Sequence, residues 1–178
     1  MAIYKKKKRF FDVDMPIINR QTQLFAYELS ELENRYINYD LTRILRGKSV
    51  LIQLKVIIED EKAKAIPNQI TLMPYFLRRM IRKGTDYVED SFLAECEDAQ
   101  LRIKPFLITR RKVSREVKKG LREKTKEELT NYLKDKSSEK IFESILKNKL
   151  QKDLSLILKK IYPLSLCEIR MLKVEKKK

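Results

Sequence analysis

The sequence predicts an α+β fold. We expect a mainly antiparallel, barrel-like β-sheet core, a short inserted helix, a C-terminal helical block and a final returning strand. Three observations support this class: apolar residues mostly alternate before residue 112, follow a helical period over 113–162, and alternate again after Pro163. Because predicted strands and helices are segregated along the chain, an antiparallel sheet is favoured over repeated strand–helix–strand units.

The composition favours a single folded domain. Of 178 residues, 43% are hydrophobic, and only three glycines and five prolines are present, with no linker rich in either. The expected parts are, in chain order, a basic N-terminal arm (1–9), a single domain (10–174) with a β-rich part (10–112), a helical part (113–162) and a final strand (165–174), and a basic tail (175–178).

Strands are predicted through the first part of the domain. FFDVD (10–14) is typical of a short strand that ends before Pro16, whereas 17–35 has no clear period and predicts no element. Residues 35–41 alternate weakly. The strongest strand is 49–58, where every second residue is apolar.

The segment 62–72 is the expected hairpin partner of 49–58. Pro67 lies in its middle and indicates an edge strand or a bulge, because proline donates no hydrogen bond to a neighbouring strand.

A short amphipathic helix is predicted over 73–83, with Pro74 in its first turn and Gly84 at its end. Its apolar side holds Phe76, Leu77, Met80 and Ile81. Its opposite side is basic and holds Arg78, Arg79, Arg82 and Lys83.

Two long strands are predicted next, over 86–98 and 100–111. In the second strand Arg102, Lys104 and Arg110 have the same parity, so they are expected to project from one face of the sheet.

The helical part begins at Val113. Its first helix has a core stripe of Val113, Val117, Leu121, Leu129 and Leu133. A basic stripe beside it holds Arg115, Lys118, Lys119, Arg122 and Lys126. One or two further helices follow, with Ser138 as the expected N-cap, and Pro163 ends the last of them.

The charge of the chain predicts a polyanionic partner. Lysine and arginine number 41 against 25 acidic residues, a net charge of +16. Nucleic acid would relieve the resulting self-repulsion and is the commonest polyanion. An anionic membrane surface is the alternative polyanion, although no run approaches 18 apolar residues and no span is expected. A merely basic protein without such a partner is the remaining alternative.

The candidate RNA-contacting residues are the lysines and arginines of the arm, the short helix, the strand 100–111 and the basic stripe. They are Lys5, Lys6, Lys7, Lys8, Arg9, Arg78, Arg79, Arg82, Lys83, Arg102, Lys104, Arg110, Arg111, Lys112, Arg115, Lys118, Lys119, Arg122 and Lys126. Arginine forks and lysine point charges mixed in this way can bridge several phosphates.

We expect no catalytic centre, cofactor, metal or small-molecule substrate. The absence of histidine excludes Ser-His and Cys-His nucleophile pairs, and no glycine-rich phosphate loop is present. Cys96 and Cys167 are expected as reduced thiols. Acidic residues crowd 86–98, where a metal-dependent nuclease site is a weaker alternative to a solvated pair of strands.

The absence of known base-reading motifs indicates how the protein would bind RNA. Aromatic residues form 8% of the chain without the paired motif of the RRM fold, and no recognition helix or zinc finger is apparent. Recognition of structured RNA by its backbone and shape fits best.

The stretch KKIYPLSLCEIRMLKV resembles the C-terminal signature of the archaeal and eukaryotic small-subunit ribosomal protein S-three-A-e family, e-S-one in unified naming. That family has a lysine-flanked Ile-Tyr-Pro-Leu, a spacer and an Ile-Arg-x-x-Lys-Val strand. The matching residues are Lys159, Lys160, Ile161, Tyr162, Pro163, Leu164, Ile169, Arg170, Lys173 and Val174. Leu77, Arg78, Ile81, Arg82 and Lys83 resemble its Leu-Arg helix, and the compact length resembles an archaeal form.

This resemblance implies a non-catalytic structural constituent of the small ribosomal subunit, on the platform near the mRNA exit. Its implied partners are small-subunit rRNA, neighbouring ribosomal proteins and mRNA near the exit, with no membrane, and its implied location is the cytoplasmic ribosome. A non-ribosomal architectural nucleic-acid-binding protein is the alternative that would use the same basic clusters.

Overall fold

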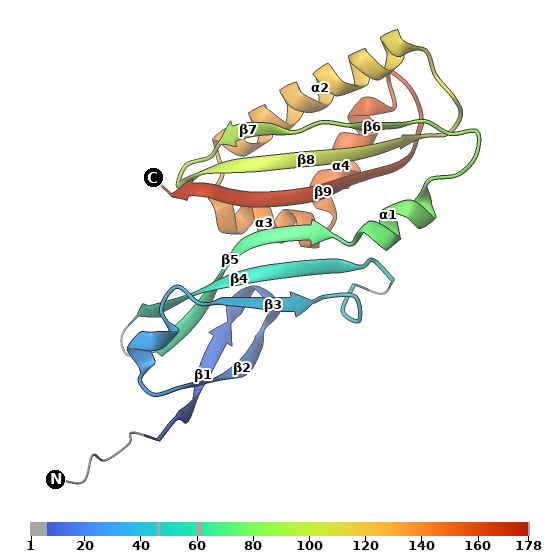
Figure 1. The fold of residues 1–178 in the computed structure, drawn as a ribbon. Coiled ribbons are helices and arrows are strands. Elements are labelled where there is room, and N and C mark those ends of the chain that lie inside the picture. Colours follow the sequence, from blue (N-terminus) through green and yellow to red (C-terminus); the bar gives the residue numbers. More distant parts are fainter. Residues whose placement is uncertain (1–6, 46, 60–61, 178) are drawn as a thin grey trace, which may run out of the picture. The chain divides into compact units, whose positions relative to one another are not determined.

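The predicted α+β class is confirmed by a computed structural model that describes residues 7–45, 47–59 and 62–177 (Figure 1). Within these residues, nine strands are joined by mainly antiparallel pairing. The strands are β1 (Arg9–Met15), β2 (Arg20–Ala26), β3 (Tyr36–Asp40), β4 (Val50–Glu59), β5 (Lys62–Leu72), β6 (Tyr87–Glu89), β7 (Phe92–Glu95), β8 (Ala99–Thr109) and β9 (Leu164–Lys177). The α-helices are α1 (Pro74–Met80), α2 (Arg115–Lys134), α3 (Ser138–Leu146) and α4 (Lys149–Leu158).

The chain divides into two compact units. The first unit contains the chain up to Tyr39 together with Ile52–Asn68, and the second contains Asp40–Leu51 and the chain from Gln69 onward. Strands β4 and β5 each begin in one unit and end in the other. The single domain expected over 10–174 stays a prediction.

In the first unit, β1 and β2 form an antiparallel hairpin. All seven residues of β1 have a partner in β2, from Arg9 opposite Ala26 to Met15 opposite Arg20. Asn19 adopts a left-handed conformation (φ 53°) just before β2, which asparagine tolerates better than most residues. Alternation then buries Val13, Met15 and Ala26 on one face of the hairpin, so its other face is exposed.

Strand β2 lies in the region where the sequence predicted no element. Of the two alternatives predicted for β5 from Pro67, an edge strand or a bulge, the edge strand is wrong, because β5 pairs with β4 and, in succession, with β1 and β9. The register places Ala63–Lys64 beside β1 and Gln69–Thr71 beside β9. Pro67 falls between these two stretches, so its missing N–H interrupts neither of them.

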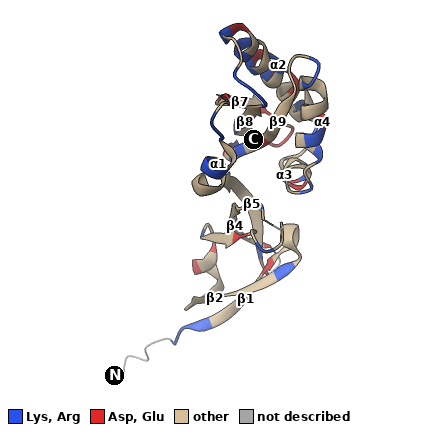
Figure 2. Cartoon of the chain, turned by 90° about the vertical axis from the view of Figure 1, so that its right-hand side faces the viewer, with Lys and Arg blue, Asp and Glu red and all other residues tan. Residues whose placement is uncertain are grey.

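In the second unit, β8 is the central strand. It pairs with β9 from end to end and with β6 and β7 on its other side. Helices α2, α3 and α4 cover one face of these strands (Figures 1 and 2). Leu101, Ile103 and Leu172 are fully buried, as are Leu121, Leu129 and Leu133 of α2. This apolar layer holds the helical block on the sheet.

Three predicted elements of the second unit end earlier or divide. Helix α1 stops at Met80, and its C-cap is Ile81 rather than Gly84. The long strand expected over 86–98 is two strands, β6 and β7, separated where the Asp90 carboxylate accepts a hydrogen bond from the Ser91 N–H (2.8 Å). Strand β8 ends at Thr109, two residues before the predicted end.

The helical block and the final strand follow the prediction with two changes. The N-cap of α3 is Ser137, and Ser138 is the first helical residue. The Ser138 N–H and hydroxyl both donate to the Asp98 carboxylate (2.8 Å and 2.6 Å), so an acidic side chain from the end of the sheet satisfies this helix terminus. Strand β9 continues through Lys177, although 175–178 was expected as a tail.

Candidate nucleic-acid interface

The turn between β8 and α2 carries a run of exposed positive charge. Arg110, Arg111 and Lys112 are consecutive and exposed, and Arg115 follows in the first turn of α2. The prediction that Arg110 shares a sheet face with Arg102 and Lys104 is wrong, because β8 ends at Thr109 and its pairing with β9 is irregular between Ile108 and Thr109. Arg110 instead joins the turn.

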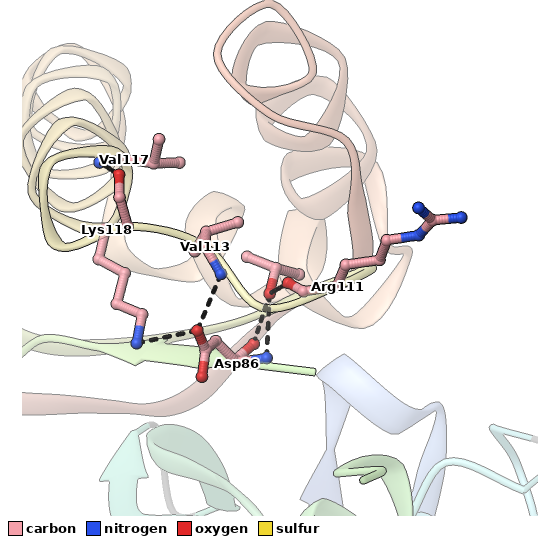
Figure 3. A network of polar contacts seen from close by, with 7 residues as sticks. Asp86, Arg111, Val113, Val117 and Lys118 are labelled. Atoms are coloured by element: carbon pink, nitrogen blue, oxygen red, sulfur yellow. Dashed lines mark hydrogen bonds and ion pairs between the residues drawn. The ribbon is translucent and has the colours of Figure 1, made fainter. Parts of the chain in front are cut away.

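Asp86, the residue directly before β6, holds this turn in place (Figure 3). Its Oδ2 accepts from the Val113 N–H (3.0 Å) and lies 3.0 Å from Lys118 Nζ. The hydrogen bond from the Val113 N–H lowers the pKa of Asp86 below its ordinary value, and Lys118 lowers it further. The carboxylate is therefore ionised at neutral pH and fixes the exit of the basic turn.

Thr109 secures the other end of the turn. Its N–H donates to the Asp86 carbonyl (2.9 Å), and its hydroxyl donates to the Arg111 carbonyl (2.7 Å). Thr109 is fully buried, whereas the side chain of Arg111 extends away from the network (Figure 3). The backbone of the turn is thus anchored while its cationic side chains stay exposed.

The basic stripe on α2 continues from this turn. Ser114 is the N-cap, and its hydroxyl accepts from the Val117 N–H (3.4 Å). Arg115, Lys119, Arg122 and Lys126 are all exposed. Lys118 differs from them, because it is half-buried against Asp86 and serves the anchor instead of the open stripe.

The cluster at α1 is exposed but only half of it is helical. Arg78 and Arg79 lie in the last turn of the helix, and Arg82 and Lys83 lie in the turn that follows. The Arg79 guanidinium is 5.6 Å from the centre of the Phe76 ring, so a buried aromatic residue supports one of these cations.

The sheet face opposite α2 carries the predicted cations Arg102 and Lys104, together with cations of β9 that were not predicted as RNA contacts. Arg102 and Lys104 alternate with the buried Leu101 and Ile103, so they point away from the helices. Arg102 lies directly opposite Lys173 of β9, and like charges in that position repel. Glu175 relieves part of this repulsion, since Arg102 Nε donates to it at 2.8 Å.

Lys173, Arg170 and Lys176 of β9 therefore belong to the same set of candidates. Arg170 is already paired with Glu89 (2.9 Å), whereas Lys176 is exposed opposite Gln100. A predicted antiparallel pairing of the last strand with 100–111 could have suggested them. Their exact register depends on two of the three register shifts in the β8–β9 ladder, which the sequence does not specify.

The N-terminal cluster belongs to the first unit. Lys7, Lys8 and Arg9 are exposed, and Lys5 and Lys6 lie outside the described residues. Lys8 Nζ is 5.6 Å from the Phe25 ring centre and 5.1 Å from that of Tyr27. A cation of the arm is thus held over aromatic side chains of β2 and the residue after it.

The acidic residues of 86–98 have structural contacts in place of a common centre. Asp86 anchors the basic turn, Glu89 pairs with Arg170, and Asp98 caps α3. Among the described residues no cluster of three or more acids and cysteines is arranged to hold a metal ion. In that same part of the chain, no helix has the length and apolar character that crossing a membrane requires.

Comparison of the sequence with known proteins supports the family that the motifs suggested. The chain is 25% identical over 180 residues to a protein of Nanoarchaeum equitans named small ribosomal subunit protein eS1, with 96% of this chain and 90% of that protein covered. The model of the Ribosomal S3Ae family matches residues 4–178. The predicted family is therefore confirmed, and the chain belongs to the Ribosomal S3Ae family.

Proposed function

We propose that this protein is a structural constituent of the small ribosomal subunit that binds rRNA through its backbone phosphates. Membership of a ribosomal protein family and the name of the archaeal relative support the assembly. The observation that carries the RNA contact is the anchored basic turn, where Arg110, Arg111 and Lys112 are exposed on a backbone held by Asp86 and Thr109.

An anchored turn suits phosphate binding for a thermodynamic reason. Ordering a flexible loop on binding costs conformational entropy, and a backbone that is already fixed avoids part of that cost. The N-terminal end of α2 adds a favourable dipole next to the turn and backbone N–H groups without an intrahelical acceptor, although that of Val117 already donates to Ser114. Phosphates would thus meet a preformed positive surface that continues along Arg115, Lys119, Arg122 and Lys126.

The remaining candidate residues supply contact points of their own. The α1 cluster, the β8–β9 face and the N-terminal arm supply further cations, and each would neutralise phosphates at positions that the fold fixes. Base edges are not needed for such contacts. The protein would serve as a structural part of the subunit, with rRNA and neighbouring ribosomal proteins as its partners. It would require no cofactor and catalyse no reaction.

We also propose the location that the family resemblance implies, which is the platform of the small subunit near the mRNA exit. The motif that carries this assignment forms the end of the helical block and β9, so it builds the second unit from which the basic turn projects. At the exit, mRNA would be a further polyanion within reach of the protein.

Co-sedimentation tests the proposed assembly. The tagged protein, expressed in its own cells, should move with small subunits through a gradient and remain there in moderate salt. Recovery only in the fractions of free protein would contradict the proposal. RNA crosslinking of the same fractions should recover small-subunit rRNA.

The architectural alternative differs in its preference among nucleic acids. A general binder would hold duplex DNA as well as a folded rRNA fragment of the same length at matched salt. A ribosomal constituent should favour the rRNA fragment, so competition between the two ligands separates the two functions.

A further inference from the structure

Aromatic side chains are exposed at one end of the β1–β2 hairpin. Phe10 is 68% exposed, Phe25 48% and Tyr27 44%. The Phe10 and Phe25 rings lie directly across the two strands with their centres 4.9 Å apart. They do not build the core of the hairpin, because its core residues Val13 and Met15 have the opposite parity on β1.

The same face of the hairpin is polar further along. Asp12 lies opposite Gln23, which donates to it at 2.9 Å, and Asp14 lies opposite Gln21, which donates to it at 2.7 Å. Because residues of one face repeat every second position, Asp12 follows Phe10 at a distance of about 7 Å. The face therefore runs from a cation, through aromatic rings, to a carboxylate and an amide.

We propose that this face binds an unpaired nucleobase of RNA, stacked on Phe25 and Phe10, a site that deepens the rRNA-binding function proposed above and rests on it. Exposed aromatic rings stack with any base, and neighbouring cations hold the attached phosphates. Lys8 lies over Phe25 and Tyr27, with Lys7 and Arg9 beside it in the chain. Charge complementarity thus favours a nucleic acid over an apolar protein segment at these rings.

The position of Asp12 adds a preference among bases. An ionised carboxylate only accepts hydrogen bonds and has capacity for about four, of which Gln23 supplies one. A base stacked on Phe10 would present its edge toward Asp12. Adenine, cytosine and guanine have an exocyclic amino group that can donate there, whereas the ring N3–H of uracil lies between two carbonyl oxygens that a carboxylate repels. The site should therefore favour amino-bearing bases over uracil.

The experiment compares single-stranded and duplex RNA on the full chain. Wild type and Phe25→Leu are titrated with a labelled oligoadenylate, an oligouridylate and an RNA duplex of equal length. Phe25→Leu keeps an apolar side chain but removes the ring. Leu156→Ala on α4 is the matched control. Leu156 is an apolar residue that is 67% exposed, and it does not belong to the hairpin.

The proposal predicts that Phe25→Leu weakens binding of oligoadenylate about tenfold and leaves duplex binding within twofold, while Leu156→Ala changes neither. Asp12→Ala should bring the affinities for oligoadenylate and oligouridylate close to each other. Circular dichroism of each variant should match wild type, since these side chains are exposed.

Each other outcome has a defined meaning. If Phe25→Leu and Phe10→Leu bind oligoadenylate as wild type does, base stacking is wrong, and the phosphate-binding function stands if the duplex still binds. That result is also the one expected of a face that docks another protein. If wild type binds neither form of RNA, both the stacking site and the proposed function are wrong.

Discussion

The β1–β2 hairpin of the first unit and the β8–α2 turn of the second unit expose different chemistry, each on a hydrogen-bonded backbone. The hairpin shows aromatic rings with one cation over them, whereas the turn shows three consecutive cations and no ring. The hairpin backbone is fixed by a regular strand ladder, and the turn is fixed by the side chain of Asp86. The difference indicates that one region is suited to bases and the other to phosphates.

The largest expected effect concerns the cores behind the two regions. Met15 is 1% exposed behind the hairpin, and Leu121 is fully buried beneath the start of α2. Truncation of either to alanine removes apolar contacts and leaves a cavity, so each should lower the free energy of unfolding by about 3 kcal/mol.

Urea unfolding followed by circular dichroism checks this prediction and the expected single domain together. Met15→Ala and Leu121→Ala should each shift one common transition, because a single domain unfolds cooperatively. Two separate transitions, each shifted by only one of the variants, would show that the two units unfold independently.

The next effect concerns the cations of the turn. Replacement of Arg110, Arg111 and Lys112 together by alanine removes three charge-assisted phosphate contacts. Affinity for a folded rRNA fragment should fall about a hundredfold at low salt, because such hydrogen bonds are stronger than neutral ones. A triple replacement of Lys134, Lys140 and Lys147 on the helical block is the control, and an equal loss in both would indicate a diffuse charge effect.

The anchor beneath the turn should have a smaller effect than the cations themselves. Asp86→Ala leaves the Val113 N–H and Lys118 without their partner, so the turn must be ordered when RNA binds. Affinity for the same fragment should fall about fivefold. Retained affinity with unchanged amide exchange at Val113 would show that the turn is held by other contacts.

The pH dependence of this anchor follows from its lowered pKa. Because the pKa of Asp86 is lower in the folded protein than in the unfolded chain, its contribution is complete above the unfolded value near 4. The contribution is lost as the pH falls through the folded value. Amide protection at Val113 should decrease in that acidic range in wild type and be independent of it in Asp86→Ala.

The last expected effect is on α3, which follows the C-terminal end of α2 and not the basic turn at its start. Asp98→Ala removes the acceptor for the Ser138 N–H and hydroxyl and should lower stability by about 1 kcal/mol. Asp98→Asn keeps an acceptor oxygen and should lose less. Thermal unfolding measures both, and RNA affinity should be unchanged; a loss of affinity would extend the interface to this end of the sheet.

The sequence was sufficient for the elements whose outer face is polar. Strands β1, β4 and β8, helix α2 and β9 were predicted because burial on one side and water on the other impose a clear period. Strand β2 was missed because Arg20 and Thr22 are polar on the face of Val13 and Met15, whereas Phe25 is apolar on the exposed face, so no alternation remains. Phe25 is also the side chain that we propose stacks on a base.

The candidate site was predictable in its residue types but not in its grouping. Exposed lysines and arginines were identified from charge alone, and most of them are exposed in the fold. Which of them act together depends on pairings distant in sequence, such as Asp86 with Lys118 and Arg102 with Glu175. A short-range pattern does not encode such pairings, and the one between Arg102 and Glu175 also depends on the irregular β8–β9 register.

The difference between the two regions is tested most directly by the salt dependence of RNA affinity. Wild type, Phe25→Leu and the triple alanine variant of 110–112 are titrated with one RNA that joins a duplex to an unpaired adenine-rich loop. Each lost phosphate contact should reduce the slope of log affinity against log salt by up to about one unit. The triple variant should therefore have a slope flatter by about two to three units, and Phe25→Leu should bind more weakly with the slope of wild type. Equal slopes for the triple variant and wild type, or a flattened slope for Phe25→Leu, would contradict the division of phosphate and base binding between the two regions.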